Sequence, residues 1–106
     1  MGEVPENSLL NILKGEPDSL IQAAGKAAKE ACGKETYCNL VADCISRTLF
    51  LGDDFARELA AVKENLVIRG KENIPAGMLT LGEISSYGET TLEFFNKTIM
   101  IGGCYE

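Results

Sequence analysis

The chain has 106 residues, of which 45% are hydrophobic and 25% charged, the composition of a single soluble globular domain. Its net charge of −6 and its ten scattered Lys and Arg residues argue against nucleic acid as a partner, because phosphate binding needs clustered basic side chains. No apolar run approaches the roughly 20 residues that a membrane span needs, so we expect no membrane partner.

The cellular compartment is predicted from the start of the chain and from its thiols. The opening MGEVPENS is acidic and polar, unlike a secretory signal. The cysteines (Cys32, Cys38, Cys44 and Cys104) lie at wide, irregular spacing in apolar surroundings, which is typical of reduced cysteine used as a small hydrophobe. We therefore expect a cytoplasmic protein.

The first half of the chain predicts a strand, a helix and a second strand. Residues 8–15 (SLLNILKG) are apolar and end at a glycine, which indicates a first strand. From Leu20 to Cys32, apolar residues recur at three- and four-residue steps, the pattern of an amphipathic helix with an alanine-rich stripe that can lie close against a sheet. Residues 36–46 (TYCNLVADCIS) predict a central strand.

The second half predicts a helix followed by two strands. Residues 52–66 form the helix, with Asp53 as its N-terminal cap. Ala76–Gly82 is the third strand, and residues 91–105 are a long last strand, antiparallel to the third because their connection is short. The order β-α-β-α-β-β predicts an α+β domain over residues 1–106: a single mixed or antiparallel β-sheet with two helices packed on it.

The side-chain inventory disfavours catalysis. The chain has no histidine, so neither a Ser-His-Asp nor a Cys-His nucleophile can be built from it. The cysteines lack the CxxC spacing of a zinc site, and no phosphate-binding glycine loop is present. We expect a non-catalytic protein with no metal and no cofactor.

Two stretches carry polar residues beside predicted strands. In DCISR, Cys44 ends a strand and Arg47 follows, where its guanidinium can bind an anion or simply lie at the surface. Cys44 is either a packed core thiol or, with its pKa lowered by Arg47, a reactive one. In GEISSYGETTLEFFNKT, Gly82 and Glu83 close a strand, and that carboxylate must be solvated, paired or functional.

The same stretch places Asn96 and Thr98 inside the predicted last strand. A lone asparagine in a strand is disfavoured unless its amide is hydrogen-bonded or exposed.

These stretches together resemble the FIST C-terminal domain, the second half of a sensory module. The resemblance rests on Cys44 and Arg47 in DCISR, on LGDDFARELAAV, on the Ile74–Gly77 and Gly82–Ile84 segments, and on Asn96 and Thr98 in LEFFNKT. The order of the motifs agrees over nearly the whole chain. One departure is Ser46, where many relatives have a glycine just before the arginine.

The resemblance implies a sensory role in signal transduction and an N-terminal FIST domain or signalling protein as partner. It also implies a small ligand, such as an amino acid, whereas the haem of some relatives would lack a histidine here. We place the ligand site at Cys44, Arg47, Gly82, Glu83, Asn96 and Thr98.

In this hypothesis Arg47 binds the carboxylate of a zwitterion and Glu83 its ammonium group; the alternative is that the two side chains pair with each other. Two other functions stay open: a protein-interaction domain that docks a partner, including a homo-oligomer, through a strand edge or a helix face, and an enzyme with Cys44 as nucleophile.

Overall fold

The computed structural model describes residues 3–32, 36, 38–66, 74–86 and 91–104. Gly33, which the sequence suggests as a C-terminal helix cap, and most of the turn segments expected at 67–75 and 85–91 lie outside these residues. The helical segments are α1 (Pro17–Ala31), α2 (Ile45–Leu51), a single 3-10 turn η1 (Gly52–Asp54) and α3 (Phe55–Asn65). The strands are β1 (Cys38–Cys44), β2 (Ala76–Thr80), β3 (Glu83–Ser85), β4 (Glu93–Phe95) and β5 (Ile99–Cys104).

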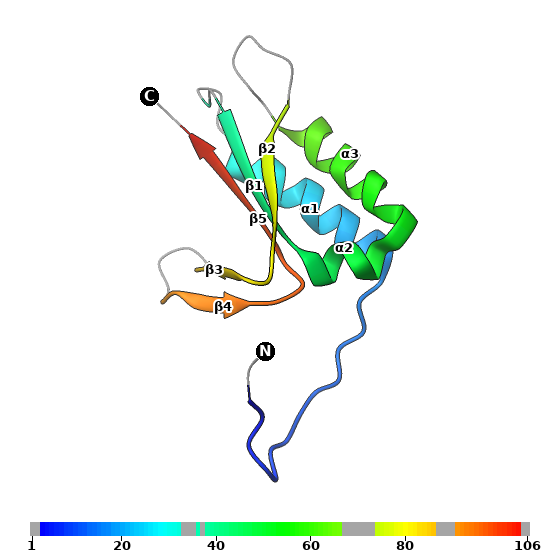
Figure 1. Cartoon of the computed structure of the whole chain (residues 1–106), viewed down its shortest axis with the longest axis vertical. Helices are drawn as coiled ribbons and strands as arrows, with labels where there is room; N and C mark the ends of the chain where they lie inside the picture. The colour runs from blue at the N-terminus through cyan, green and yellow to red at the C-terminus, as the bar shows by residue number, and fades with distance from the viewer. Residues whose placement is uncertain (1–2, 33–35, 37, 67–73, 87–90, 105–106) are drawn as a thin grey trace.

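The strands form two sheets. The larger has the order β2-β1-β5, with β2 parallel and β5 antiparallel to the central strand β1. The smaller sheet is the antiparallel hairpin of β3 and β4, which crosses below the larger sheet (Figure 1). The predicted α+β class is confirmed, but the prediction of a single sheet is wrong.

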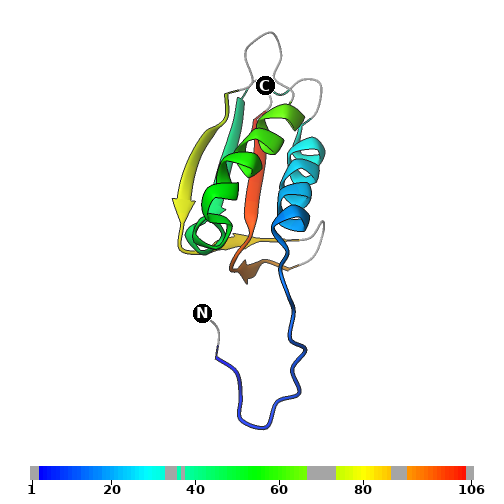
Figure 2. The same cartoon turned by 90° about the vertical axis from the view of Figure 1, so that its right-hand side faces the viewer.

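Helices α1 and α3 lie side by side on one face of the larger sheet (Figures 1 and 2). Their contact is close because small residues meet there: a Cβ added to Gly25 of α1 would lie 3.2 Å from the Asn65 amide nitrogen and 3.6 Å from the Ala61 carbonyl oxygen. The core between the helices and the sheet consists of Ala24, Ala28, Val41, Val62 and Leu66. The alanine-rich stripe of the predicted first helix therefore does bring it close to its neighbours.

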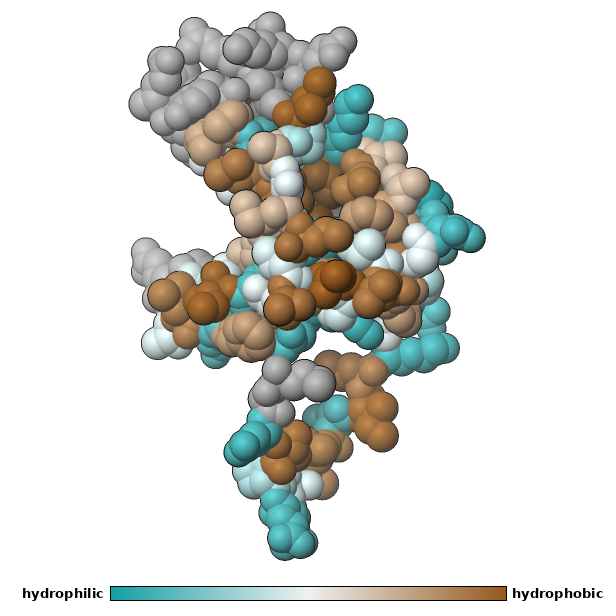
Figure 3. All heavy atoms as spheres, viewed as in Figure 1, coloured by the Kyte–Doolittle hydropathy of each residue, from teal (hydrophilic) through white to brown (hydrophobic). Residues whose placement is uncertain are grey.

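The opposite face of the larger sheet has no helix on it among the described residues (Figure 2). Side chains alternate along a strand, so the residues that share this face with Leu40 follow from the strand register. They are Cys38, Ala42, Ala76, Met78, Met100, Gly102 and Cys104. Leu40 and Met78 are 50% and 62% exposed, and Figure 3 shows apolar side chains gathered over the strands.

The predicted first strand is absent. Residues 3–16 instead form an extended arm that leaves the start of α1 and points away from the body (Figure 1). Its large apolar side chains at Leu9, Leu10, Ile12 and Leu13 are 101%, 63%, 97% and 90% exposed. The segment is apolar, but a strand needs hydrogen bonds from a neighbouring strand, and none of the described strands pairs with it.

Two further boundaries differ from the prediction. The central strand ends at Cys44, and α2 begins directly after it. The predicted long last strand is divided into β4 and β5 by a bend at Asn96 and Lys97, where Lys97 has a φ of 60°. A positive φ is incompatible with a continuous strand, so the predicted pairing of the last strand with Ala76–Gly82 is replaced by two separate pairings.

Candidate functional site

Four charged side chains lie buried together at the carboxyl end of β1. Asp43 is the penultimate residue of the strand, Arg47 lies on α2, Glu58 on α3 and Glu83 at the start of β3, and they are only 3%, 3%, 0% and 4% exposed. We call these four residues the polar cluster. Burying charges is costly unless each has a partner, so their contacts determine what the cluster can do.

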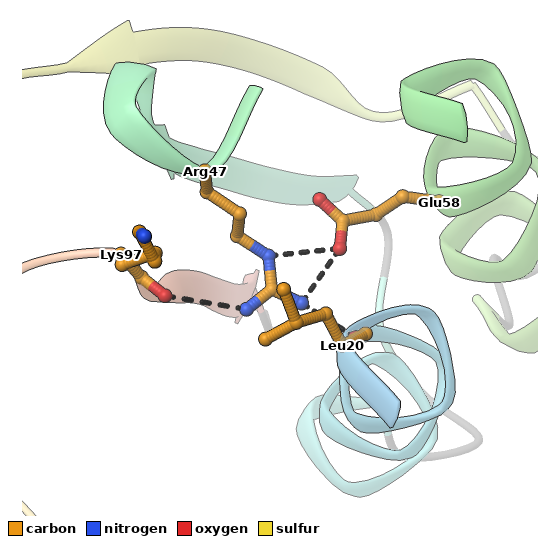
Figure 4. A network of polar contacts seen from close by, with 4 residues as sticks. All are labelled: Leu20, Arg47, Glu58 and Lys97. Atoms are coloured by element: carbon orange, nitrogen blue, oxygen red, sulfur yellow. Dashed lines mark hydrogen bonds and ion pairs between the residues drawn. The ribbon is translucent and has the colours of Figure 1, made fainter. Parts of the chain in front are cut away.

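Arg47 holds the cluster together. Its Nε and Nη2 donate to Glu58 Oε2 at 2.8 and 2.6 Å, and Nη2 also donates to the Leu20 carbonyl at 2.5 Å (Figure 4). Its Nη1 donates to the Lys97 carbonyl at 3.4 Å. One side chain thus joins α2 to α1, to α3 and to the chain entering β5.

Glu83 is held by hydroxyl groups. Thr80 and Thr98 both donate through Oγ1 to its carboxylate, one to each oxygen. The Lys97 carbonyl accepts a hydrogen bond from Arg47, and the hydroxyl of the next residue, Thr98, donates one to Glu83. The chain at Lys97 and Thr98 therefore contacts both charged side chains. The direct ion pair that the sequence suggested as an alternative is not among the contacts of the described residues, because Arg47 pairs with Glu58.

Asp43 lies in a strongly perturbed electrostatic environment. Burial, the nearby carboxylate of Glu58, a hydrogen bond with Glu58 and the charge of Glu83 raise the pKa of the Asp43 carboxyl group to about 7, although Arg47 lowers it. Neither Asp43 oxygen nor Glu58 Oε1 accepts a hydrogen bond from any other described residue. A proton shared between Asp43 and Glu58 Oε1 satisfies both groups, which is the arrangement that a raised pKa produces.

Cys44 is a core thiol with 0% exposure, and its sulfur lies 3.0 Å from the Ser46 hydroxyl. Burial raises the pKa of the Cys44 thiol, but hydrogen bonds from the Ser46 side chain and from the backbone at Lys97 and Ser46 outweigh it, so the net direction is downward. Ser46 itself is helical, within α2, so the departure from the family pattern at this position demands no positive φ.

The other predicted site residues are less central. Gly82 packs where a Cβ would collide with the Phe94 ring and lie 3.1 Å from the Phe95 carbonyl, so it permits the close approach of β3 and β4. Asn96 is exposed in the bend before β5. Five of the predicted residues therefore lie in or next to the polar cluster, whereas Asn96 is at the surface.

Two hollows flank the polar cluster. The larger, of about 640 Å³, lies between α1, β5 and the β3–β4 hairpin, and Arg47 and Thr98 form part of its wall. Its apolar wall includes Ala23, Ala27, Ala31, Ile99, Met100 and Ile101, and its polar wall includes Lys26, Glu30, Ser85 and Ser86. The smaller, of about 270 Å³, lies between β2 and α3 with Asp43 in its wall.

Sequence reasoning missed Asp43, Glu58 and the α1 side of the larger hollow. The signal for Glu58 was present, because it lies between Phe55 and Val62 on the predicted apolar face of the second helix. Asp43 lies two residues after Val41 in the predicted central strand, so the two side chains point to the same, inward face of the sheet. Charged residues at buried positions indicate a paired or functional group.

Comparison with known families identifies the class of the domain. The fold is an α+β domain with a helical layer on one side of a mixed sheet and a buried polar cluster at the end of the central strand. The model of the FIST C domain matches residues 1–86, so the chain belongs to the FIST C domain family. Membership places it among sensory domains of signal transduction. No curated protein matches the chain, and no solved structure does.

The match includes the N-terminal arm and the polar cluster up to Glu83, and it stops before β4 and β5, so Asn96 and Thr98 lie beyond it. Within the described residues, no helix is long and apolar enough to cross a membrane, and no group of His, Cys, Asp or Glu side chains is arranged to hold a metal ion.

Proposed function

We propose that this domain senses a small amino acid or carboxylate that binds in the larger hollow between α1, β5 and the β3–β4 hairpin. The observation that supports this is the position of Arg47 and Thr98 in the wall of that hollow. Its volume of about 640 Å³ falls within the range of small-molecule sites, and it combines apolar walls with a few polar groups.

The charged groups at the hollow are complementary to a zwitterion. Lys26 and Glu30 stand one helical turn apart on α1, and their mutual ion pair is long, at 3.7 Å, and exposed. An exposed pair of this kind is weak, so a ligand competes with it at little cost. Lys26 then binds the ligand carboxylate and Glu30 its ammonium group, while the alanines of α1 contact its side chain.

Arg47 contributes at the base of the hollow. A guanidinium has five N–H donors, and the contacts within the described residues use four of them. The remaining Nη1 hydrogen is available to a ligand carboxylate. Because Arg47 also contacts α1, α3 and Lys97, binding there is communicated to three elements of the domain. An N-terminal FIST domain or another signalling partner would read this change.

We further propose that the domain is not an enzyme. The thiol of Cys44, the one candidate nucleophile that the sequence raised, is fully buried behind the polar cluster, and the chain supplies no histidine as base.

The test is a thermal-shift and calorimetric screen against amino acids and small carboxylates. Ala27→Phe fills the hollow and should abolish the ligand-dependent rise in Tm, while Ala60→Phe, at an exposed position on α3, should leave it intact. Lys26→Gln should weaken binding of carboxylates, and Lys29→Gln, on the same helix but outside the hollow, should not. A ligand whose affinity is unchanged by Ala27→Phe binds elsewhere and refutes this site.

A further inference from the structure

The outer edge of β5 is an unused strand edge. Within the described residues, β1 pairs with one side of β5 and no strand pairs with the other. The Cys44 amide donates to the Thr98 carbonyl at 3.1 Å. In this antiparallel register, the backbone N–H and C=O groups of the even-numbered residues of β5 therefore point toward β1. The N–H and C=O groups of Ile99 and Ile101 therefore point to the open side, along the larger hollow.

The N-terminal arm has the composition of a strand that lacks a sheet. Leu9, Leu10, Ile12 and Leu13 project to both sides of an extended chain, which suits a strand covered on both faces. The family match includes these residues, so the arm belongs to the domain. Figure 3 shows its apolar side chains standing clear of the body.

Topology indicates where such a strand belongs. Helix α1 begins beside α2, at the carboxyl end of β1, since Gly15 lies next to Phe50, and it ends against Gly103 at the other end of β5. A strand that feeds α1 therefore runs parallel to β1 and antiparallel to β5. Crossover connections are right-handed, and α1 and α3 share one face of the sheet, so this strand must lie on the side of β1 opposite β2. That position is the free edge of β5.

The arm of the same copy points the other way. Glu16 is extended, with φ −110° and ψ 135°, because Pro17 follows it at the start of α1. Lys14 and Glu16 lie on the same side of this extended segment and form an ion pair at 2.7 Å. The extended conformation thus continues to the first residue of the helix, and the arm leaves the start of α1 and runs away from the larger sheet (Figures 1 and 2).

The exposed surface is also larger than that of a compact monomer. A folded chain of 11.4 kDa typically exposes about 5,800 Å², whereas this one exposes 8,012 Å². The excess of roughly 2,200 Å² exceeds the roughly 800 Å² that each partner buries in a standard protein interface. Each copy therefore has enough spare surface for a stable dimer.

We propose that two copies exchange their arms: residues 8–13 of each copy add as an antiparallel strand to the free edge of β5 in the other. The backbone groups of Ile99 and Ile101 pair with the incoming strand, and its leucines cover the alanines of α1 on one face. The interface is two-fold symmetric, with the same contact made twice. This inference does not rest on the proposed ligand, but the incoming arm and that ligand would both lie in the larger hollow.

The first test is the oligomeric state of the whole chain by sedimentation equilibrium. The native protein should dimerise, and Leu9→Asn with Ile12→Asn should weaken dimerisation by at least about 100-fold, because two apolar contacts are lost in each arm. Leu49→Asn, at a position of α2 that is 76% exposed, is the matched control and should leave the dimer unchanged. A monomer at all concentrations overturns the proposal.

The second test mixes two defective variants. The arm variant Leu9→Asn with Ile12→Asn keeps an intact hollow, and Ala27→Phe blocks the hollow but keeps an intact arm. Neither variant should dimerise alone, while their mixture should form a heterodimer through one arm, detected by native mass spectrometry. If the arm folds back onto its own copy, the mixture forms no heterodimer. If dimers form through the exposed sheet face, each variant dimerises alone as well as in the mixture, and either result refutes the exchange.

Hydrogen exchange supplies an independent readout. The amides of Ile99 and Ile101 should be protected in the dimer and exposed in the arm variant. Because the arm variant leaves the hollow intact, ligand binding to it tests the proposed function separately: loss of dimerisation with ligand binding kept supports both ideas, and retained dimerisation overturns only the arm exchange.

Discussion

Removing the Arg47 side chain should destabilise the fold far more than an ordinary substitution. Arg47→Met deletes both hydrogen bonds to Glu58 and the contacts to the carbonyls of Leu20 and Lys97. Glu58, which is 0% exposed, is then left beside Asp43 with no cation. Breaking one side of a buried ion pair costs about 3–5 kcal/mol, a large part of the roughly 5–15 kcal/mol that stabilises a domain.

The assay is urea unfolding followed by far-UV circular dichroism, with Tm measured in parallel. We expect a loss of about 3–5 kcal/mol and a Tm lower by at least about 12 °C. The double variant Arg47→Met with Glu58→Leu removes the stranded charge and should recover most of that loss, because an apolar pair can replace a buried ion pair with little change in stability. A loss below about 1 kcal/mol in Arg47→Met, or a double variant weaker than the single one, would refute the reasoning.

Three further predictions concern other parts of the molecule. The pKa of Asp43 is raised from 3.8 to about 7 in the folded state, so the protonated carboxyl group stabilises the fold fully below pH 3.8, and this contribution to the free energy of unfolding, at most about 4 kcal/mol, is lost as the pH rises to about 7. Asp43→Asn should remove this pH-dependent loss of stability in urea unfolding, and an unchanged pH dependence in that variant would contradict the assignment. Gly103→Ala places a Cβ 2.7 Å from the Ala31 carbonyl oxygen and should cost about 1–3 kcal/mol in urea unfolding, whereas Gly102→Ala, with no atom within 4 Å, should cost well under 1 kcal/mol. Thiol labelling of the native protein should leave Cys44 unmodified at least roughly 100 times longer than in denaturant, despite its lowered pKa, because it is 0% exposed; rapid native labelling would restore it as a candidate nucleophile.

Hydrophobic periodicity predicted secondary structure correctly for the segments that pack against other elements of the domain. The alanine-rich helix and the second helix were predicted from their apolar spacing, and both pack on the sheet as expected. The central strand was located to within two residues at each end. These segments bury one face against neighbours that the sequence itself supplies, so local pattern and tertiary structure agree.

The predictions that were wrong depend on contacts between distant segments, which the hydrophobic pattern of the sequence does not encode. Residues 8–15 have the composition of a strand, but none of the strands that the structure describes pairs with them. The last strand breaks at Lys97, whose positive φ no apolar count reveals. The partner of Arg47 was expected to be a ligand or Glu83, whereas Glu58 on α3 provides it, since only the folded geometry brings α2 and α3 together.

The strand order β2-β1-β5 has a consequence for how the protein acquires its structure during synthesis. The central strand emerges early, but one of its two neighbours is the final described element, and the hydroxyl of Thr98 just before it helps to hold Glu83. Long-range pairing of this kind makes folding slow, because a large loop must close first. A nascent chain therefore displays two of the three strands of the larger sheet, and buried charges that lack the Lys97 and Thr98 contacts, until residue 104 has left the ribosome, and chaperone contact in that interval is to be expected.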